Sequence, residues 1–253
     1  MQIKSIAAAV ATAAIMSISS AASAQEITEF RIGILGGENA NDRLKSHECL
    51  KDRTEALLGV ETKIFAPADY SGVIEGLIGG NLDMAWLGAS AYAAVYMADP
   101  EAVEPVLVKI NTDGSYGYYS VGFARVDSGI KSLDDMKGKV FAFGDPNSTS
   151  GYLIPSVEIP EGGYSKATDA GLVDMTEIQE IWRSKVIPEG PIVLRKALPE
   201  RVKLQMTGLM ASLESMDPEC AYSVMAGEVK GIAPIGHDAY ISVIEARKAS
   251  MKN

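Results

Sequence analysis

The stretch Lys139-Val-Phe-Ala-Phe-Gly-Asp-Pro-Asn-Ser-Thr-Ser-Gly-Tyr-Leu-Ile154 predicts a buried strand, a tight turn and the start of a helix. Its first half is a short apolar run that ends in turn residues, which is typical of a strand. Asn147 or Ser148 would cap the helix, and the amides just beyond a cap have no carbonyl of the same helix to donate to. With the hydroxyls of Ser148, Thr149 and Ser150, these amides fit either an ordinary Ser-rich cap or a site for a tetrahedral oxyanion.

The segment upstream of this stretch alternates strands with helices. Strands are predicted over 30–35, 61–65 and 82–87, with helices over 40–58 and from Asp69 or Ser71 to residue 78. Such alternation predicts a parallel sheet, and binding sites on parallel sheets lie at the carboxyl ends of the strands. Here those ends carry Gly36-Gly37-Glu38, Asp69-Tyr70-Ser71 and Gly88-Ala89-Ser90.

The remaining pattern suggests a chain that leaves one lobe and returns to it. Two strands over 106–110 and 118–124 flank a turn with nothing helical between them, so they are predicted to pair antiparallel. The second is long enough to cross into another lobe. After residue 154, prolines and glycines predict a break in the helix, and 166–172 is weakly helical. Strands over 177–182 and 191–195 then predict a return to the first lobe.

Residues 1–24 have the pattern of a secretory signal peptide. Lys4 precedes an apolar run, and Ala22-Ser23-Ala24 matches a cleavage site before Gln25. The run is too short for a transmembrane helix, and polar residues follow it. The residue directly after the cleavage site is Gln25 rather than a cysteine, so we expect an exported protein without a lipid anchor.

The chain is acidic. Its 253 residues include 33 Asp and Glu against 23 Lys and Arg, which gives a formal net charge of −10, and removing the leader takes away one of the lysines. An acidic surface argues against nucleic acid and anionic membranes as partners. It does not argue against a small anion that binds in a local pocket.

Histidine and cysteine are scarce. His47 and His237 are far apart in the sequence and stand alone, so neither a metal centre nor a His-based catalytic centre is expected. Cys49 and Cys220 would be permitted to form a disulfide in an oxidising compartment, or they remain two separate buried thiols.

Several segments, read in order, resemble the phosphonate/phosphite-binding proteins of bacterial ABC importers, a PhnD-like family of periplasmic substrate-binding proteins. The likeness covers most of the chain after the leader, and the Gly-Asp-Pro-Asn-Ser-Thr-Ser-Gly block is its most specific part. The segments that carry it are Phe65-Ala-Pro-Ala-Asp-Tyr-Ser-Gly-Val-Ile-Glu-Gly-Leu77, Leu82-Asp-Met-Ala-Trp-Leu-Gly-Ala-Ser90, Asp113-Gly-Ser-Tyr-Gly-Tyr-Tyr-Ser-Val121, Phe143-Gly-Asp-Pro-Asn-Ser-Thr-Ser-Gly151, Ile181-Trp-Arg-Ser184 and Ile187-Pro-Glu-Gly-Pro-Ile-Val193.

The resemblance implies an α/β type II periplasmic binding fold, with two lobes around a ligand cleft. Lobe 1 would comprise 25–120 and 189–253, and lobe 2 would comprise 121–188. The implied ligand-binding residues are Ser148, Thr149, Ser150 and the amide of Gly151, with Tyr70 and Tyr118 from matching family motifs.

The chain departs from the family pattern in the second lobe. Family members continue after Ser-Thr-Ser-Gly into a strand, a Gly-Gly-His-Glu-like loop, a helix and an Asp-bearing strand. Here the sequence passes directly onward between Tyr164 and Lys166. We therefore expect a shortened second lobe that lacks the residues with which relatives pair a ligand ammonium group.

The resemblance also implies a function. The expected protein is the periplasmic solute-binding component of an ABC importer, a monomer that binds a phosphonate, phosphite or phosphate-like oxyanion and docks on a permease of the inner membrane. It would be no enzyme and need no cofactor or metal. Two alternatives use the same serines: a ligand-sensing partner of a membrane receptor, and a secreted phosphate hydrolase with Ser148 or Ser150 as nucleophile.

Overall fold

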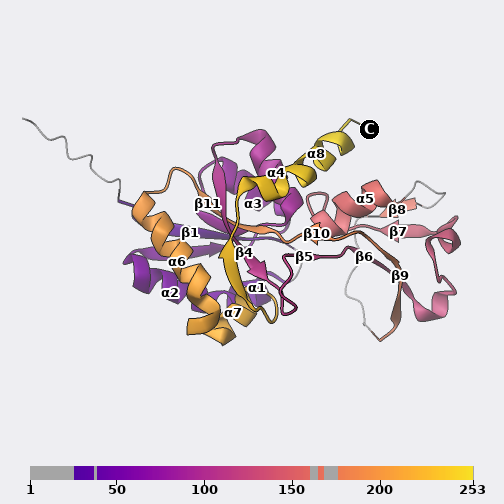
Figure 1. Cartoon of the computed structure of the whole chain (residues 1–253), viewed down its shortest axis with the longest axis horizontal. Coiled ribbons are helices and arrows are strands. Elements are labelled where there is room, and N and C mark those ends of the chain that lie inside the picture. The colour runs from indigo at the N-terminus through magenta and orange to yellow at the C-terminus, as the bar shows by residue number, and fades with distance from the viewer. Residues whose placement is uncertain (1–25, 37–38, 160–164, 168–175, 253) are drawn as a thin grey trace, which may run out of the picture.

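The computed structural model describes residues 26–36, 39–159, 165–167 and 176–252 (Figure 1). The predicted signal peptide lies outside these residues. Within the described part, no helix is long and apolar enough to cross a membrane.

The first lobe is built on a six-stranded sheet in the order β12-β4-β11-β3-β1-β2. Strand β1 (Glu29–Ile34) pairs parallel with β2 (Glu61–Phe65) and with β3 (Met84–Trp86), as the strand–helix alternation predicts. The returning strand β11 (Pro191–Arg195) enters antiparallel between β3 and β4 (Val103–Ile110). Strand β12 (Gly231–Pro234) adds to the far side of β4 and completes the sheet.

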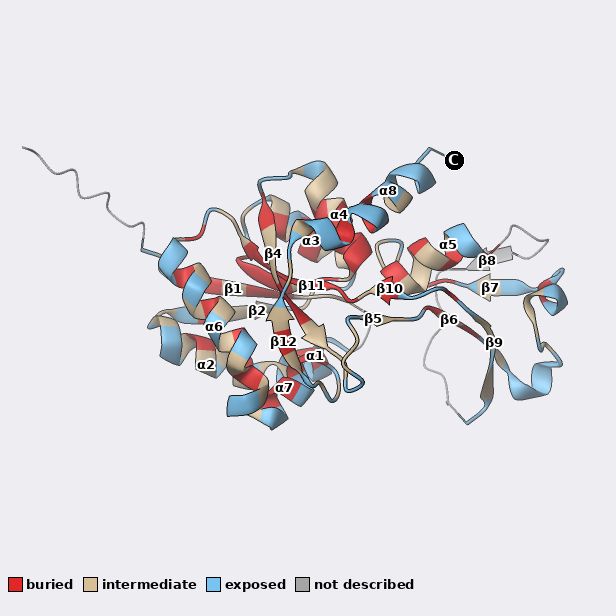
Figure 2. Cartoon of the chain, in the orientation of Figure 1, coloured by how far each residue is buried: buried red, intermediate tan, exposed pale blue. Residues whose placement is uncertain are grey.

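Helices cover both faces of this sheet, and the buried residues lie between the helices and the strands (Figure 2). On one face lie α3 (Tyr70–Ile78), α4 (Ala89–Ala98) and α8 (Ile241–Ser250), packed through a core that includes Val73, Ala85, Tyr92 and Tyr240. On the other lie α1 (Ala40–Ser46), α2 (Glu48–Leu58), α6 (Glu200–Met216) and α7 (Pro218–Val224), packed through a core that includes Phe30, Leu50, Leu107 and Met206. Each large apolar side chain buried here stabilises the lobe by about 1.5–3 kcal/mol.

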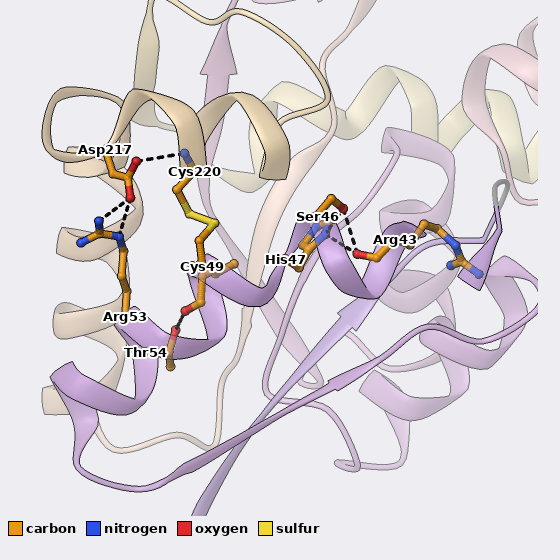
Figure 3. The surroundings of a disulfide bond; sticks show 9 residues. Arg43, Ser46, His47, Cys49, Arg53, Thr54, Asp217 and Cys220 are labelled. Atoms are coloured by element: carbon orange, nitrogen blue, oxygen red, sulfur yellow. Dashed lines mark hydrogen bonds and ion pairs between the residues drawn. A yellow bond between two sulfur atoms is a disulfide. The ribbon is translucent and has the colours of Figure 1, made fainter. Parts of the chain in front are cut away.

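A disulfide joins α2 to α7. Cys49 and Cys220 have Cα atoms 5.8 Å apart, within the normal range for a bridge, so the disulfide is formed and the two-thiol alternative is wrong. Asp217 caps α7 by accepting the Cys220 amide at 3.1 Å, and Arg53 on α2 donates to the same carboxylate (Figure 3).

The helix predicted over 40–58 is two helices, α1 and α2, because the backbone leaves the helical region at His47.

The chain crosses between the lobes twice. Strands β5 (Gly117–Tyr118) and β10 (Ile187–Pro188) pair antiparallel at the crossing. The predicted pairing of 106–110 with 118–124 is wrong, because β4 has β11 and β12 as its neighbours in the sheet. Buried Ser120 interrupts the second run: its amide donates to Ser184 on the returning chain.

The second lobe holds small sheets in its described part. Strand β6 (Val121–Arg125) pairs antiparallel with β9 (Ile178–Arg183), and β7 (Val140–Ala142) pairs parallel with β8 (Ser165–Ala167). Residues of β6, β7 and β9 are mostly exposed or half-buried (Figure 2). Two short 3₁₀ segments, η1 (Val126–Ser128) and η2 (Leu133–Met136), lie between β6 and β7.

The stretch after β7 forms the predicted turn and helix start. A π-helical turn, η3 (Thr149–Leu153), continues directly into α5 (Ile154–Glu158). The predicted break at Pro155 is wrong. The Gly151 carbonyl, four residues before this proline, accepts the Gly144 amide at 2.7 Å in place of a helical amide. Lys166 and Ala167 lie in strand β8 rather than a helix, and the rest of that predicted helix lies outside the described residues. A shortened second lobe stays a prediction, because residues 160–164 and 168–175 of that lobe lie outside the described part of the chain.

Candidate functional site

The structure brings together the predicted hydroxyl residues. Tyr70 starts α3 after β2, and Tyr118 ends β5, so both stand where the chain emerges from regular strands. Ser148 lies near enough to Tyr70 to lower the pKa of its phenol, and Ser150 and Thr149 act in the same way on Tyr118. We call these five side chains the hydroxyl cluster.

Residues 144–151, here called the oxyanion loop, hold Ser148 in a fixed position. Ser148 caps the helix, and its Oγ accepts the Gly151 amide at 3.0 Å. The Gly144 amide donates to the Gly151 carbonyl at 2.7 Å, which closes the loop on itself. A Cβ on Gly151 would lie 2.9 Å from the Ser148 Oγ, so only glycine fits here without moving that hydroxyl.

Thr149 links the loop to the first lobe. Its Oγ1 accepts the Ser90 amide at 2.8 Å, and the Thr149 residue is 2% exposed. The cap residue of α4, Gly88, has no side chain to satisfy the first amides of that helix, so the Thr149 hydroxyl takes this role from the other lobe. Because its oxygen accepts that bond, the hydroxyl hydrogen of Thr149 is left for the cluster.

Two further loop residues contact the first lobe and were missed as site residues in the sequence. Asp145 accepts the Tyr70 amide at 3.1 Å through Oδ2 and the Asn147 amide at 2.7 Å through Oδ1. The Asn147 side-chain amide donates to the Ser71 hydroxyl at 3.3 Å. Asp and Asn in a Gly-Asp-Pro-Asn turn commonly bind nearby backbone groups, so the sequence marked these residues as turn formers. It did not show their contacts with Tyr70 and Ser71, which lie about 75 residues away in sequence.

The electrostatic setting of the cluster favours neutral donors. Burial raises the pKa of Tyr70 and of Tyr118, and hydrogen bonds from the serine hydroxyls only partly oppose that shift. Both phenols therefore keep their protons at neutral pH. The charge of nearby Glu189 raises the pKa of Tyr118 further.

A cavity of about 890 Å³ opens beside the cluster, and Tyr70 and Tyr118 form part of its wall. Its wall also carries an ion pair between half-buried Lys109 and buried Glu189, with Lys109 Nζ 3.2 Å from Glu189 Oε1. The Lys109 ammonium lies over the Trp86 ring at 5.3 Å, and the indole N–H donates to the Gly190 carbonyl at 3.0 Å. Sequence reasoning missed this pair, because Lys109 and Glu189 lie on separate strands and form no local motif.

The structure places both histidines in contacts with residues outside the cluster. His47 Nδ1 lies 2.9 Å from both the Ser46 Oγ and the Arg43 carbonyl, and burial lowers its pKa. His237 Nδ1 lies 2.8 Å from the Tyr92 hydroxyl. In the part of the chain that the structure describes, no group of three or more metal-ligating side chains gathers.

Sequence comparison identifies relatives of the chain. The profile of the family described as "ABC transporter, phosphonate, periplasmic substrate-binding protein" matches residues 32–170. The chain is 34% identical over 137 residues to the phosphate-import protein PhnD of Mycolicibacterium smegmatis, covering 54% of this chain and 43% of that protein. It is 33% identical over 190 residues to the phosphonates-binding periplasmic protein of Escherichia coli, covering 59% and 55%. The chain thus spans about half the length of the curated relatives it matches.

Solved structures share the fold. A binding protein component of an ABC phosphonate transporter from Pseudomonas aeruginosa has a TM-score of 0.77 at 21% identity, covering 88% of this chain and 87% of that one. PhnD1 of Prochlorococcus marinus, solved in complex with methylphosphonate, has a TM-score of 0.75 at 17% identity, covering 89% and 99%. These likenesses confirm the predicted α/β periplasmic binding fold.

Proposed function

Because the chain belongs to the family of periplasmic substrate-binding proteins of phosphonate ABC transporters, we propose that it is the solute-binding component of an ABC importer. In this proposal it holds a phosphorus oxyanion at the hydroxyl cluster, between the two lobes. The observation that carries the proposal is that Ser148, Thr149 and Ser150 lie together at one helix start. Tyr70, whose amide donates to Asp145 of the same loop, and Tyr118 line the cavity beside it.

The chemistry of the cluster fits a tetrahedral dianion. A dianion taken out of water needs several hydrogen-bond donors, and a helix start supplies amides and a favourable dipole. Ser148, Ser150 and the first amides of η3 would hold the phosphorus-bound oxygens, with the Tyr70 and Tyr118 hydroxyls opposite. Relatives carry names that include phosphonate, phosphite and phosphate. The class shared by those names is the phosphorus oxyanion, and this class is the ligand that we propose.

The cavity beside the cluster would take the rest of the ligand. Trp86, Lys109 and Glu189 lie on its wall, so a substituent on phosphorus would meet an aromatic face and a paired charge. Phosphate and phosphite would leave this space to water. A phosphonate with a polar substituent would fill part of it.

Ligand-bound lobes would present the surface that a membrane permease recognises. We propose that the protein acts in this way in the periplasm, as a monomer, and that it turns over no substrate. The hydrolase alternative lacks support, since neither His47 nor His237 contacts a serine of the cluster in the described structure. A general base must lie within hydrogen-bond reach of such a nucleophile.

Isothermal titration of the disulfide-intact chain with methylphosphonate, phosphite and phosphate, with sulfate as the competing tetrahedral anion, tests the proposal. We expect saturable binding of at least one phosphorus oxyanion, and a thermal shift equivalent to about 2.7 kcal/mol at a ligand concentration of 100 Kd. Ser148→Ala should weaken binding, whereas Ser215→Ala, which removes a hydroxyl from an exposed position on α6, should not. Absence of heat and of a thermal shift with all three phosphorus oxyanions would contradict the proposal.

A further inference from the structure

The C-terminal helix α8 carries a cation, Arg247, whose side chain contacts the oxyanion loop. Helix α8 packs on α4 through buried Val243 and Ile244, and buried Tyr240 directly before α8 adds to the same contact. Arg247 follows at the next position of the same helical stripe, so its side chain runs along α4 toward the second lobe. Figure 1 shows α8 extending from the first lobe in the direction of α5.

The Arg247 guanidinium bridges the two lobes. One of its terminal nitrogens donates to the Ser90 Oγ at 2.8 Å, and the other donates to the Asn147 Oδ1 at 2.6 Å. Ser90 belongs to α4 of the first lobe, and its amide donates to Thr149. Asn147 lies in the oxyanion loop, directly before Ser148. A single side chain therefore hydrogen-bonds one residue of the first lobe and one residue of the oxyanion loop.

The charge of Arg247 is not cancelled by a direct partner. Both of its hydrogen-bond acceptors are neutral, and among the described residues no carboxylate lies within ion-pair distance of it. Burial lowers its pKa, while Asp145, which is not in direct contact, raises it. The Asp145 carboxylate already accepts the Tyr70 and Asn147 amides, and an arginine stays protonated in this setting.

We propose that Arg247 is a positioning residue of the oxyanion site, one that holds the loop against the first lobe and whose half-buried charge favours a dianion in the hydroxyl cluster. The inference rests on the proposed function for its ligand. The guanidinium reaches Asn147 and Ser90, which flank the cluster, so the proposed oxyanion lies within range of its field without touching it. A half-buried charge is screened less by solvent than a surface charge, so its loss weakens anion binding at this range.

Two substitutions separate the charge of Arg247 from its contacts. Arg247→Lys keeps the charge and loses part of the hydrogen bonding, whereas Arg247→Gln keeps a hydrogen-bonding group and loses the charge. We expect Arg247→Gln to raise the Kd for methylphosphonate about tenfold or more and to flatten its dependence on ionic strength. Arg247→Lys should raise the Kd about threefold or less and keep the wild-type salt dependence.

The matched control is Lys248→Gln, which removes a charge from the neighbouring residue of α8. Lys248 is exposed and pairs with Glu245, so this variant should bind methylphosphonate as the wild type does. Equal weakening by the Lys and Gln variants of Arg247, with an unchanged salt dependence, would overturn the role of the charge. So would wild-type affinity in Arg247→Gln.

Hydrogen exchange without ligand tests the positioning role independently. The amides of residues 144–151 should exchange several-fold faster in Arg247→Gln than in the wild type, and at the wild-type rate in Lys248→Gln. Unchanged exchange in Arg247→Gln would overturn the role of Arg247 in holding the loop. If the wild type bound no phosphorus oxyanion, the proposed function would fail, and the exchange comparison would still decide whether Arg247 holds the loop.

Discussion

The Thr149 hydroxyl accepts a hydrogen bond of 2.8 Å from the Ser90 amide, although the two residues belong to different lobes. The bond caps α4, whose own cap residue is a glycine, and it fixes the first residue of η3. A side chain proposed to bind the ligand therefore also helps to hold the lobes together. Folding and binding share this contact, and its loss should affect both.

Thr149→Val should lower both stability and affinity. Valine keeps the shape of threonine but leaves the buried Ser90 amide without its acceptor, which costs about 1–3 kcal/mol. Urea unfolding without ligand would measure this loss, and titration with methylphosphonate would measure the loss of affinity. Thr149→Ser keeps the acceptor and should retain most of both. Wild-type stability in Thr149→Val would show that the interlobe cap is not formed in solution.

Tyr70→Phe and Tyr118→Phe should each weaken oxyanion binding by about five- to tenfold, because each removes one hydroxyl from the cluster, a hydrogen bond worth roughly 1–1.5 kcal/mol. Isothermal titration with the best-binding phosphorus oxyanion is the measurement. Tyr116→Phe is the matched control, since this tyrosine is 50% exposed, does not line the cavity and is not part of the cluster. Unchanged affinity in both cluster variants would remove the tyrosines from the site.

Gly151→Ala should weaken binding through Ser148. The added Cβ would come within 2.9 Å of the Ser148 Oγ, so the hydroxyl must move from its place in the cluster. We expect a loss of affinity at least as large as that of Ser148→Ala, measured by the same titration. Gly208→Ala on α6 is the control: a Cβ there meets no atom within 4 Å, and the change should stabilise the helix by about 0.5–1 kcal/mol without altering binding.

Reduction of the Cys49–Cys220 disulfide should destabilise the first lobe. The bond closes a loop across 171 residues of sequence and joins two helices of one face, so its loss is expected to cost about 2–4 kcal/mol. Denaturant unfolding with and without a thiol reductant measures the effect. The double variant Cys49→Ala, Cys220→Ala should lose a similar amount and show no further change on reduction. Equal stability of the oxidised and reduced chains would contradict this prediction.

Alkaline pH should destabilise the native chain through its buried tyrosines. Burial raises the pKa of Tyr118 and Tyr70 above the ordinary value, and raises that of Tyr92 to about 12. Their neutral forms are favoured in the native state, so this contribution is complete below about pH 10 and is lost as pH rises through the native pKa values. Urea unfolding of the wild type and of Tyr92→Phe between pH 8 and 11 is the measurement. The free energy of unfolding should fall less with rising pH in the variant than in the wild type. An identical pH profile for variant and wild type would contradict the assignment.

Local sequence predicted much of the fold and supplied the residues of the proposed site. The alternation around β1, β2 and β3 predicts the parallel half of the sheet, because strand and helix periodicities are encoded in neighbouring residues. The hydroxyls of Ser148 to Ser150 stand out for the same reason, since a cap and its turn are formed by consecutive residues. The resemblance to family motifs then added Tyr70 and Tyr118 to the predicted ligand-binding residues.

Other features depend on residues that meet only in the folded chain. Asn147 and Arg247 are 100 positions apart, and Lys109 and Glu189 lie on different strands. No local pattern sets their separation, so their pairing follows from how the sheet and the lobes pack. The same holds for β4, whose neighbours are the distant strands β11 and β12 rather than the next segment of chain.

The sequence by itself therefore determined the family, the parallel strands and the residue types of the oxyanion loop, because each depends on short-range order along the chain. Only the tertiary structure decided the disulfide, the ion pair on the cavity wall and the arginine behind the loop. These interactions depend on distances across the fold, and such distances are set by packing of the whole core rather than by any one segment.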